Sequence, residues 1–119
     1  MFSNIDNSKT LLRELLRINR NNLIACGYEK LSVSSAGAKK LMNIPVDAKY
    51  AEIRVESSIT GVPALRYLAL GDIQLPTSTD GLPLSNLDFF DVTGTPNLIN
   101  LRVIYISGGT NVLHVQYYK

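Results

Sequence analysis

The sequence contains a single cysteine, a single histidine and no long apolar run. Because Cys26 has no partner for an internal disulfide, nothing indicates folding in an oxidising compartment. No stretch approaches the roughly 20 apolar residues that span a membrane, and the opening MFSNIDNSK lacks the basic-then-apolar order of a secretory signal. We therefore expect a protein that is made in the cytosol, stays there or is assembled there into a larger particle, and does not contact a membrane.

The shortage of histidine and cysteine also limits the chemistry that the chain can perform. A Ser–His or Cys–His catalytic arrangement would have to use His114, and the sequence has no GxSxG segment. One cysteine and one histidine cannot supply the ligands of a structural zinc site. We expect no catalytic site, no cofactor and no metal, and we interpret His114 as a side chain on one face of a strand.

Several acids lie around a long turn-rich stretch, residues 71–86. Their spacing does not match an EF-hand loop, so turn formation explains them better than a calcium site, although that alternative stays open. Asp88 and Asp91 are three residues apart in an expected strand, so their carboxylates point to opposite faces and do not form an acid–base pair. We expect Arg66 and Arg102 to form ion pairs with such acids. The acids are Asp72, Asp80, Asp88 and Asp91.

Residues 8–22, SKTLLRELLRINRNN, form the only convincing helix, because apolar residues recur on one face with the 3.6-residue period. The formal net charge of +2 comes entirely from residues 1–30, since the remainder of the chain balances to zero. The leucine face consists of Leu11, Leu12, Leu15 and Leu16. The basic stripe consists of Lys9, Arg13, Arg17 and Arg20.

Each face of this helix has two interpretations. The leucines either close one end of the β domain or dock on another chain. The basic stripe is either a solvated face or the contact for an acidic partner, which could be a protein or packaged nucleic acid. We expect residues 1–27 to be a helical attachment segment that uses these side chains, and residues 28–119 to be a β domain.

After Tyr28 the period of the apolar residues changes to two, which indicates β-strands. The clearest strand is YAEIRVES, where Ala51, Ile53 and Val55 alternate with charged residues. About six to eight short strands without interleaved helices predict an all-β fold, namely an antiparallel, jelly-roll-like β-sandwich with one N-terminal amphipathic helix. The expected strands cover residues 28–34, 38–45, 50–57, 64–70, 87–93 and the two arms of a hairpin at 101–119, with a break at 94–97.

The hairpin is predicted from the last nineteen residues, LRVIYIS–GGTN–VLHVQYYK. Both arms are rich in β-branched and aromatic residues, and Gly108 and Gly109 allow the positive φ angles of a tight turn. Leu113 and its alternate neighbours should face the core, while His114 and its alternate neighbours should face outwards. We expect the chain to end in this framework strand, without a tail.

The order of features from residue 28 onwards resembles small β-sandwich virion proteins of tailed bacteriophages. In that group a proline and an alanine precede an AxIxVE-type strand. An RY pair, a P-T turn with a later glycine, an LxxLR-like segment and a strand ending in YY follow. This chain departs from the pattern in having ALGD after the RY pair, where others often carry a DGT-like turn. The matching positions are Pro45, Ala48, Ala51, Ile53, Val55, Glu56, Arg66, Tyr67, Pro76, Thr77, Gly81, Leu98, Leu101, Arg102, Tyr117 and Tyr118.

The resemblance implies a capsid decoration, head fibre, or neck or tail component that is oligomeric and not catalytic. Such a protein would assemble with itself or with other virion proteins, inside the bacterial host and then in the virion. Nucleic acid contact would be confined to the N-terminal basic stripe. One alternative is a module that binds host-surface carbohydrate through residues 71–86 and exposed tyrosines such as Tyr118 and Tyr67. A small hydrolase that depends on His114 is the third hypothesis.

Overall fold

The computed structural model describes residues 22–34 and 37–119. The predicted helix at 8–22 lies outside these residues except for Asn22, so its leucine face and basic stripe stay predictions. The residues concerned are Lys9, Leu11, Leu12, Arg13, Leu15, Leu16, Arg17 and Arg20.

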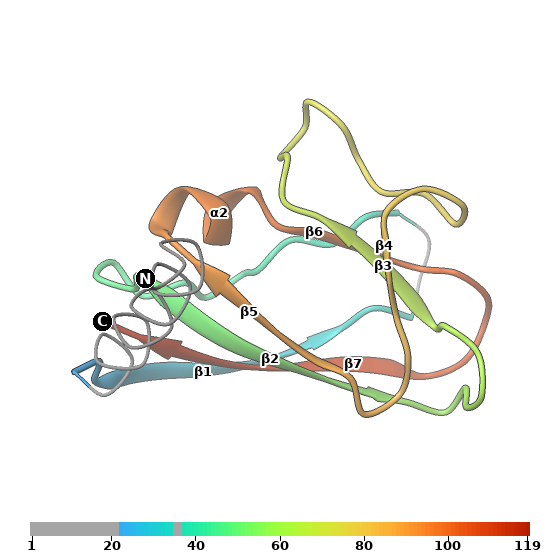
Figure 1. The fold of residues 1–119 in the computed structure, drawn as a ribbon, viewed down its shortest axis with the longest axis horizontal. Coiled ribbons are helices and arrows are strands. Elements are labelled where there is room, and N and C mark those ends of the chain that lie inside the picture. The colour runs from blue at the N-terminus through green and yellow to red at the C-terminus, as the bar shows by residue number, and fades with distance from the viewer. Residues whose placement is uncertain (1–21, 35–36) are drawn as a thin grey trace, which may run out of the picture.

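The described chain is mostly β-structure, as the sequence predicts, with seven strands and one short helix (Figure 1). The strands form two antiparallel sheets, one of four strands in the order β1-β7-β2-β5 and one of three strands in the order β4-β3-β6. The elements are β1 (Ala25–Ser32), β2 (Tyr50–Ser57), β3 (Leu65–Leu68), β4 (Leu82–Leu84), β5 (Phe89–Thr93), α2 (Thr95–Asn100), β6 (Arg102–Tyr105) and β7 (Asn111–Tyr118).

The alternation in the clearest strands places their apolar side chains on one side of the four-stranded sheet. In β2, Ile53 is fully buried and the neighbouring Glu52 and Arg54 are exposed. In β7, Leu113 is buried and His114 lies on the opposite face, as predicted. Antiparallel strands with one apolar and one polar face are typical of sheets that cover a core on one side only.

The predicted C-terminal hairpin is wrong. Its two arms belong to different sheets, because β6 pairs with β3 whereas β7 pairs with β1 and β2. Both edges of β7 are therefore occupied, and no edge is left for β6. Gly108 and Gly109 lie in a connection that crosses from one sheet to the other (Figure 1).

Three other segments also differ from the predictions. Residues 38–45 form no strand and contribute only an isolated bridge between Lys39 and Val103. Residues 71–86, expected to be turns, contain the short strand β4 around Pro83. The expected break at 94–97 begins helix α2, so a helix does lie between two strands. It starts after Gly94 (φ 97°) and buries Leu98.

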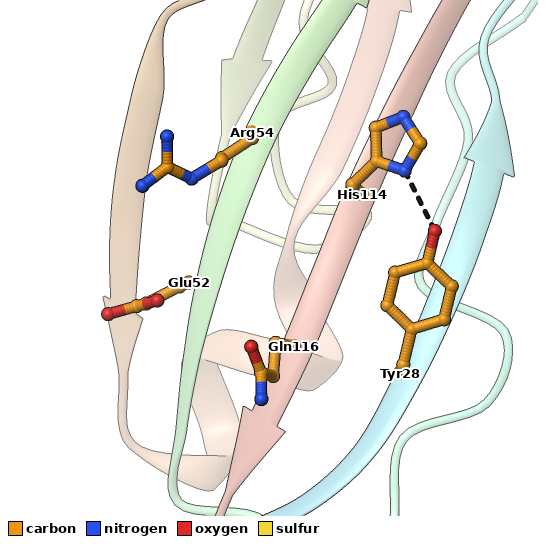
Figure 2. A pocket seen from close by; sticks show the side chains of 5 residues that line it. All are labelled: Tyr28, Glu52, Arg54, His114 and Gln116. Atoms are coloured by element: carbon orange, nitrogen blue, oxygen red, sulfur yellow. Dashed lines mark hydrogen bonds between the residues drawn. The ribbon is translucent and has the colours of Figure 1, made fainter.

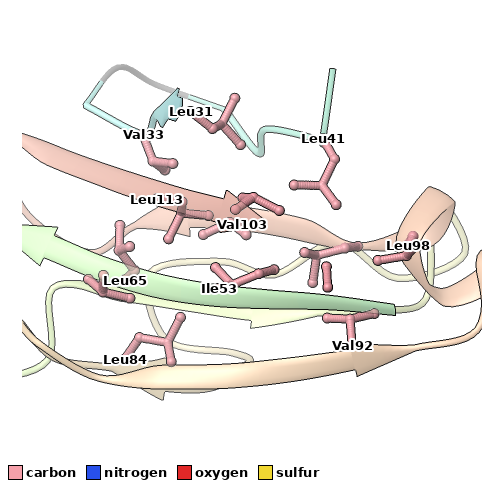
Figure 3. Packing of buried hydrophobic residues seen from close by; sticks show 14 of the residues in the cluster. Leu31, Val33, Leu41, Ile53, Leu65, Leu84, Val92, Leu98, Val103 and Leu113 are labelled. Carbon is pink, nitrogen blue, oxygen red and sulfur yellow. The ribbon is translucent and has the colours of Figure 1, made fainter. Parts of the chain in front are cut away.

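The hydrophobic side chains of both sheets belong to one buried cluster (Figure 3). Tyr67 from β3 and Phe90 from β5 lie at its border, with stacked rings. Tight packing of this kind makes large-to-small substitutions costly. The cluster consists of Leu31, Val33, Leu41, Ala48, Ala51, Ile53, Val55, Ala64, Leu65, Leu84, Val92, Leu98, Leu101, Val103, Leu113, Val115 and Tyr117.

A buried polar cluster lies around Asn111, the first residue of β7. Asn111 is fully buried, and its side chain accepts a hydrogen bond from the Ser57 hydroxyl (2.6 Å) and donates one to the Val33 carbonyl (3.2 Å). The Ser57 hydroxyl also accepts from the backbone N–H of Ile59 (3.0 Å). These hydrogen bonds join β2, β7 and the residue after β1, and they offset the cost of removing the polar groups from water.

Candidate functional site

The outer face of the four-stranded sheet carries a polar site on three adjacent strands. The register places Lys30, His114 and Arg54 in one row across β1, β7 and β2. The next row contains Tyr28, Gln116 and Glu52. Outward side chains on neighbouring strands lie close enough to form one site. Figure 2 shows five of these residues around the site.

His114 is held between two neighbours. Its Nδ1 atom shares a hydrogen bond with the Tyr28 hydroxyl at 2.8 Å, and the two rings stack with centroids 6.2 Å apart. Its Nε2 atom lies 3.8 Å from Glu56 Oε2. The hydrogen bond and the ring contact with Tyr28 orient the imidazole on the sheet face.

Two hollows lie on either side of the row formed by His114 and Arg54, and we call them together the His114 groove. One, of about 100 Å³, is lined by Tyr28, Glu52, Arg54, His114 and Gln116 (Figure 2). The other, of about 190 Å³, is lined by Arg54, Val55, Glu56, Leu87 and His114. The Arg54 guanidinium lies 5.5 Å from the centroid of the Phe89 ring on β5, a cation–π contact that orients it.

Leu87, at the rim of the groove, has a backbone conformation that leucine rarely adopts. Its φ angle is +71°, and Leu87 is the one non-glycine residue with positive φ in the described ranges. Its N–H donates to the Val55 carbonyl (2.9 Å), which fixes the turn before β5. The left-handed conformation costs a residue with a Cβ about 1–2 kcal/mol. Because the Leu87 side chain is 78% exposed, burial in the described structure does not offset that cost.

The opposite face of β1 holds a buried acid. Glu29 is buried, and its carboxylate accepts hydrogen bonds from the Tyr117 hydroxyl and from the backbone N–H groups of Met42 (3.2 and 3.1 Å) and Asn43 (3.1 Å). Burial raises the pKa of Tyr117 far above its ordinary value, and the hydrogen bond to Glu29 and the charge of Glu29 raise it further. The pair ties the segment after Leu41 to β1 and β7, and its full complement of partners marks it as structural.

The structure places the two predicted sugar-stacking tyrosines differently from the sequence-based expectation. The Tyr67 ring stacks on Phe90 (centroids 4.3 Å apart), so that face is not available to a ligand. Tyr118 packs against Tyr50 and donates a hydrogen bond to Glu52 (3.4 Å). Burial, followed by the charge of Glu52, raises the pKa of Tyr118.

The ion pairing expected for the two strand arginines is found for Arg102, whose partner is Asp72. Arg66 donates hydrogen bonds to the carbonyls of Ser78 (3.1 Å) and Gly81 (2.9 Å), which fold the loop before β4 over the sheet. Arg102 donates to the carbonyl of Ile99 and contacts Asp72, with 3.4 Å between the nearest atoms. Asp91 lies on β5 of the four-stranded sheet, whereas the strands that carry the two arginines belong to the other sheet.

The acids of the long loop mainly shape turns. Asp80 accepts hydrogen bonds from the Thr77 hydroxyl, and Asp88 accepts one from the backbone N–H of Ser85 (2.7 Å). Residues 22–34 and 37–119 contain no group of three His, Cys, Asp or Glu side chains that could hold a metal ion. No helix among those same residues is long and apolar enough to cross a membrane.

Comparison with known proteins gives no relative. No family model, no curated protein and no solved structure matches the chain.

Sequence reasoning identified only His114 among the residues of the groove. The alternation in β2 and β7 shows that Arg54 and Gln116 point outwards, but it does not show that they are neighbours of Tyr28. That information lies in the register, which places β7 between β1 and β2. As an arrangement, the groove offers hydrogen-bond donors, acceptors and apolar walls, which are the features of a binding site.

Proposed function

We propose that the chain is a non-enzymatic structural component of a tailed-phage virion. Its two sheets would form a jelly-roll-like β-sandwich, and the helix predicted at residues 8–22 would be the attachment element. The expected boundary at residue 27 is corrected, because residues 25–27 already belong to β1. It would assemble with itself or with neighbouring capsid, neck or tail proteins, and it would contact nucleic acid only through the basic stripe. The resemblance of residues 28–119 to small virion proteins supports this assignment, and the single buried cluster that both sheets share supports the sandwich arrangement.

The observation that carries the proposal is an exposed apolar surface on the segment between β3 and β4. This segment projects beyond the strands (Figure 1), and Ile73 on it is 93% exposed. Leu70 and Leu75 on the same segment are also exposed. Exposed apolar side chains along one segment are the kind of surface that another subunit can cover.

Molar mass in solution tests the assembly part of the proposal. We expect the full chain to form an oligomer, measured by light scattering, and the double substitution Ile73→Ser with Leu75→Ser to shift it towards the monomer. Val46→Ser is the matched control, because Val46 is equally exposed but lies outside this segment. A wild-type monomer, or an oligomer that the double substitution leaves unchanged, would contradict the role of this surface.

Particle incorporation tests the virion part. A tagged chain expressed during phage infection should co-purify with particles and be detected in them by immunoblot. Deletion of residues 1–22 should leave a β-rich circular dichroism spectrum but abolish incorporation. If the shortened chain is incorporated normally, the attachment role of the N-terminal segment is wrong. If the full chain is never found in particles, the virion assignment is wrong.

A further inference from the structure

The His114 groove has the chemistry of a ligand site that the structural role does not use. It combines an exposed aromatic ring, Tyr28, with donors from Arg54 and Gln116 and acceptors from Glu52 and Glu56. All of these side chains belong to described strands, so a rigid sheet positions them.

The mixture of charges limits what the groove can bind. Two carboxylates, Glu52 and Glu56, repel an anion, while the guanidinium of Arg54 repels a cation. A neutral ligand with many hydroxyl groups avoids both penalties, because each hydroxyl can donate to a carboxylate and accept from an arginine or an amide. Hydrogen-bonding groups of both kinds beside an aromatic ring favour a sugar, whose C–H face packs on the ring while its hydroxyls face the polar groups.

Leu87 gives the second observation. Its positive φ directs an apolar side chain into solvent at the rim of the larger of the two hollows, where it forms the apolar wall. Strained residues that persist in a native structure are frequent at ligand sites. A sugar ring in that hollow would bury the exposed Leu87 side chain.

From these observations we propose that the His114 groove binds a neutral carbohydrate, one or two hexose units in length. Tyr28 and Leu87 form its apolar walls, Arg54 and Gln116 donate to sugar oxygens, and Glu52 and Glu56 accept from sugar hydroxyls. The hydrogen bond between His114 Nδ1 and the Tyr28 hydroxyl orients the Tyr28 ring. The proposal does not depend on the virion assignment.

The test is a titration of the full ¹⁵N-labelled chain with the methyl glycosides of glucose, galactose, mannose and N-acetylglucosamine, followed by amide shifts. We expect at least one glycoside to shift the amides of Tyr28, Arg54, Leu87 and His114 saturably. Because the hollows are small, the dissociation constant should be about 1–10 mM. Acetate and inorganic phosphate, at equal concentrations, should shift these amides less than that glycoside.

Two substitutions with matched controls separate the groove from the rest of the surface. Gln116→Ala and Leu87→Gly should each weaken glycoside binding about tenfold. Gln74→Ala and Val46→Gly change exposed residues outside the groove and should leave binding unchanged. The proposal is overturned if no glycoside shifts the groove amides, if either anion binds more tightly, or if the groove variants bind as tightly as the controls.

Discussion

The rings of Tyr67 and Phe90 stack with centroids 4.3 Å apart and an angle of 18° between their planes, and they connect the two sheets. Tyr67 comes from β3 of the three-stranded sheet and Phe90 from β5 of the four-stranded sheet. No hydrogen-bond ladder links β3 to β5, so side-chain contact is what joins the sheets at this point.

We expect Tyr67→Ala to lower the free energy of unfolding by about 3–4 kcal/mol, because it removes the stacked ring and leaves a cavity between the sheets. Tyr67→Phe keeps the ring and should change the free energy by less than about 1 kcal/mol. Urea denaturation of both variants measures the difference. Equal losses for the two would show that the hydroxyl, and not the ring, is the stabilising group.

The buried pair of Tyr117 and Glu29 should make stability fall at high pH. The pKa of Tyr117 is raised in the folded state above the ordinary value of 10.0, so both states keep this proton below about pH 10 and the contribution is fully present there. As the pH rises above about 10, the Tyr117 hydroxyl loses its proton in the unfolded chain first. The free energy of unfolding therefore falls.

Urea denaturation at pH 8 and at pH 10.5 measures this effect. Tyr117→Phe should cost about 1–3 kcal/mol at pH 8, because it removes one donor from the buried carboxylate of Glu29. It should also reduce the loss of stability between the two pH values relative to the wild type. A variant that loses as much stability as the wild type over this interval would show that other tyrosines cause the pH dependence.

Two adjacent glycines in the connection between β6 and β7 should differ in how much an alanine substitution destabilises the fold. Gly109 has φ +122°, and an added Cβ would lie 2.9 Å from Ile59 Cγ1, whereas a Cβ at Gly108 would meet nothing within 4 Å. Gly109→Ala should therefore lower the free energy of unfolding by about 1–3 kcal/mol. Gly108→Ala should change it by less than about 1 kcal/mol. Thermal denaturation of the two variants decides the matter, and equal effects would contradict the described path of this connection.

Leu87→Gly should be tolerated, although it removes a large apolar side chain. The substitution relieves a left-handed strain of about 1–2 kcal/mol and adds about 0.5–1 kcal/mol of backbone entropy cost. We expect the free energy of unfolding to stay within about 1 kcal/mol of the wild-type value, or to rise, in urea denaturation. A loss above about 2 kcal/mol would show that the Leu87 side chain contributes to the packing of the fold.

The alternation of apolar residues correctly predicted which side of each clear strand faces the core. Leu113 and Ile53 are buried because a period of two leaves one face apolar, and that signal is local. The same signal could not show that β6 and β7 lie in different sheets. Gly108 and Gly109 fit a tight turn and a crossing between sheets equally well, and only the pairing of β7 with two other strands distinguishes them.

The groove could be predicted only in part for the same reason. His114 was recognised as an outward-facing strand residue, but its neighbours Tyr28 and Glu56 are far from it in sequence. The exposed position of Leu87 depends on its φ angle, which leucine rarely adopts and which no pattern of residue types indicates. Helix α2 is only six residues long and has no side-chain cap at Gly94, so Pro96 in its first turn is a weak start signal.

The central place of β7 has a consequence for how the protein folds during synthesis. β1 and β2 each pair with β7 and not with each other, so β1 has no strand partner until residues 111–118 have left the ribosome. Contacts between segments so far apart in sequence slow folding towards milliseconds to seconds. Until then, β1 is unpaired in the described sheet, and the strand that completes this sheet is made after the other three.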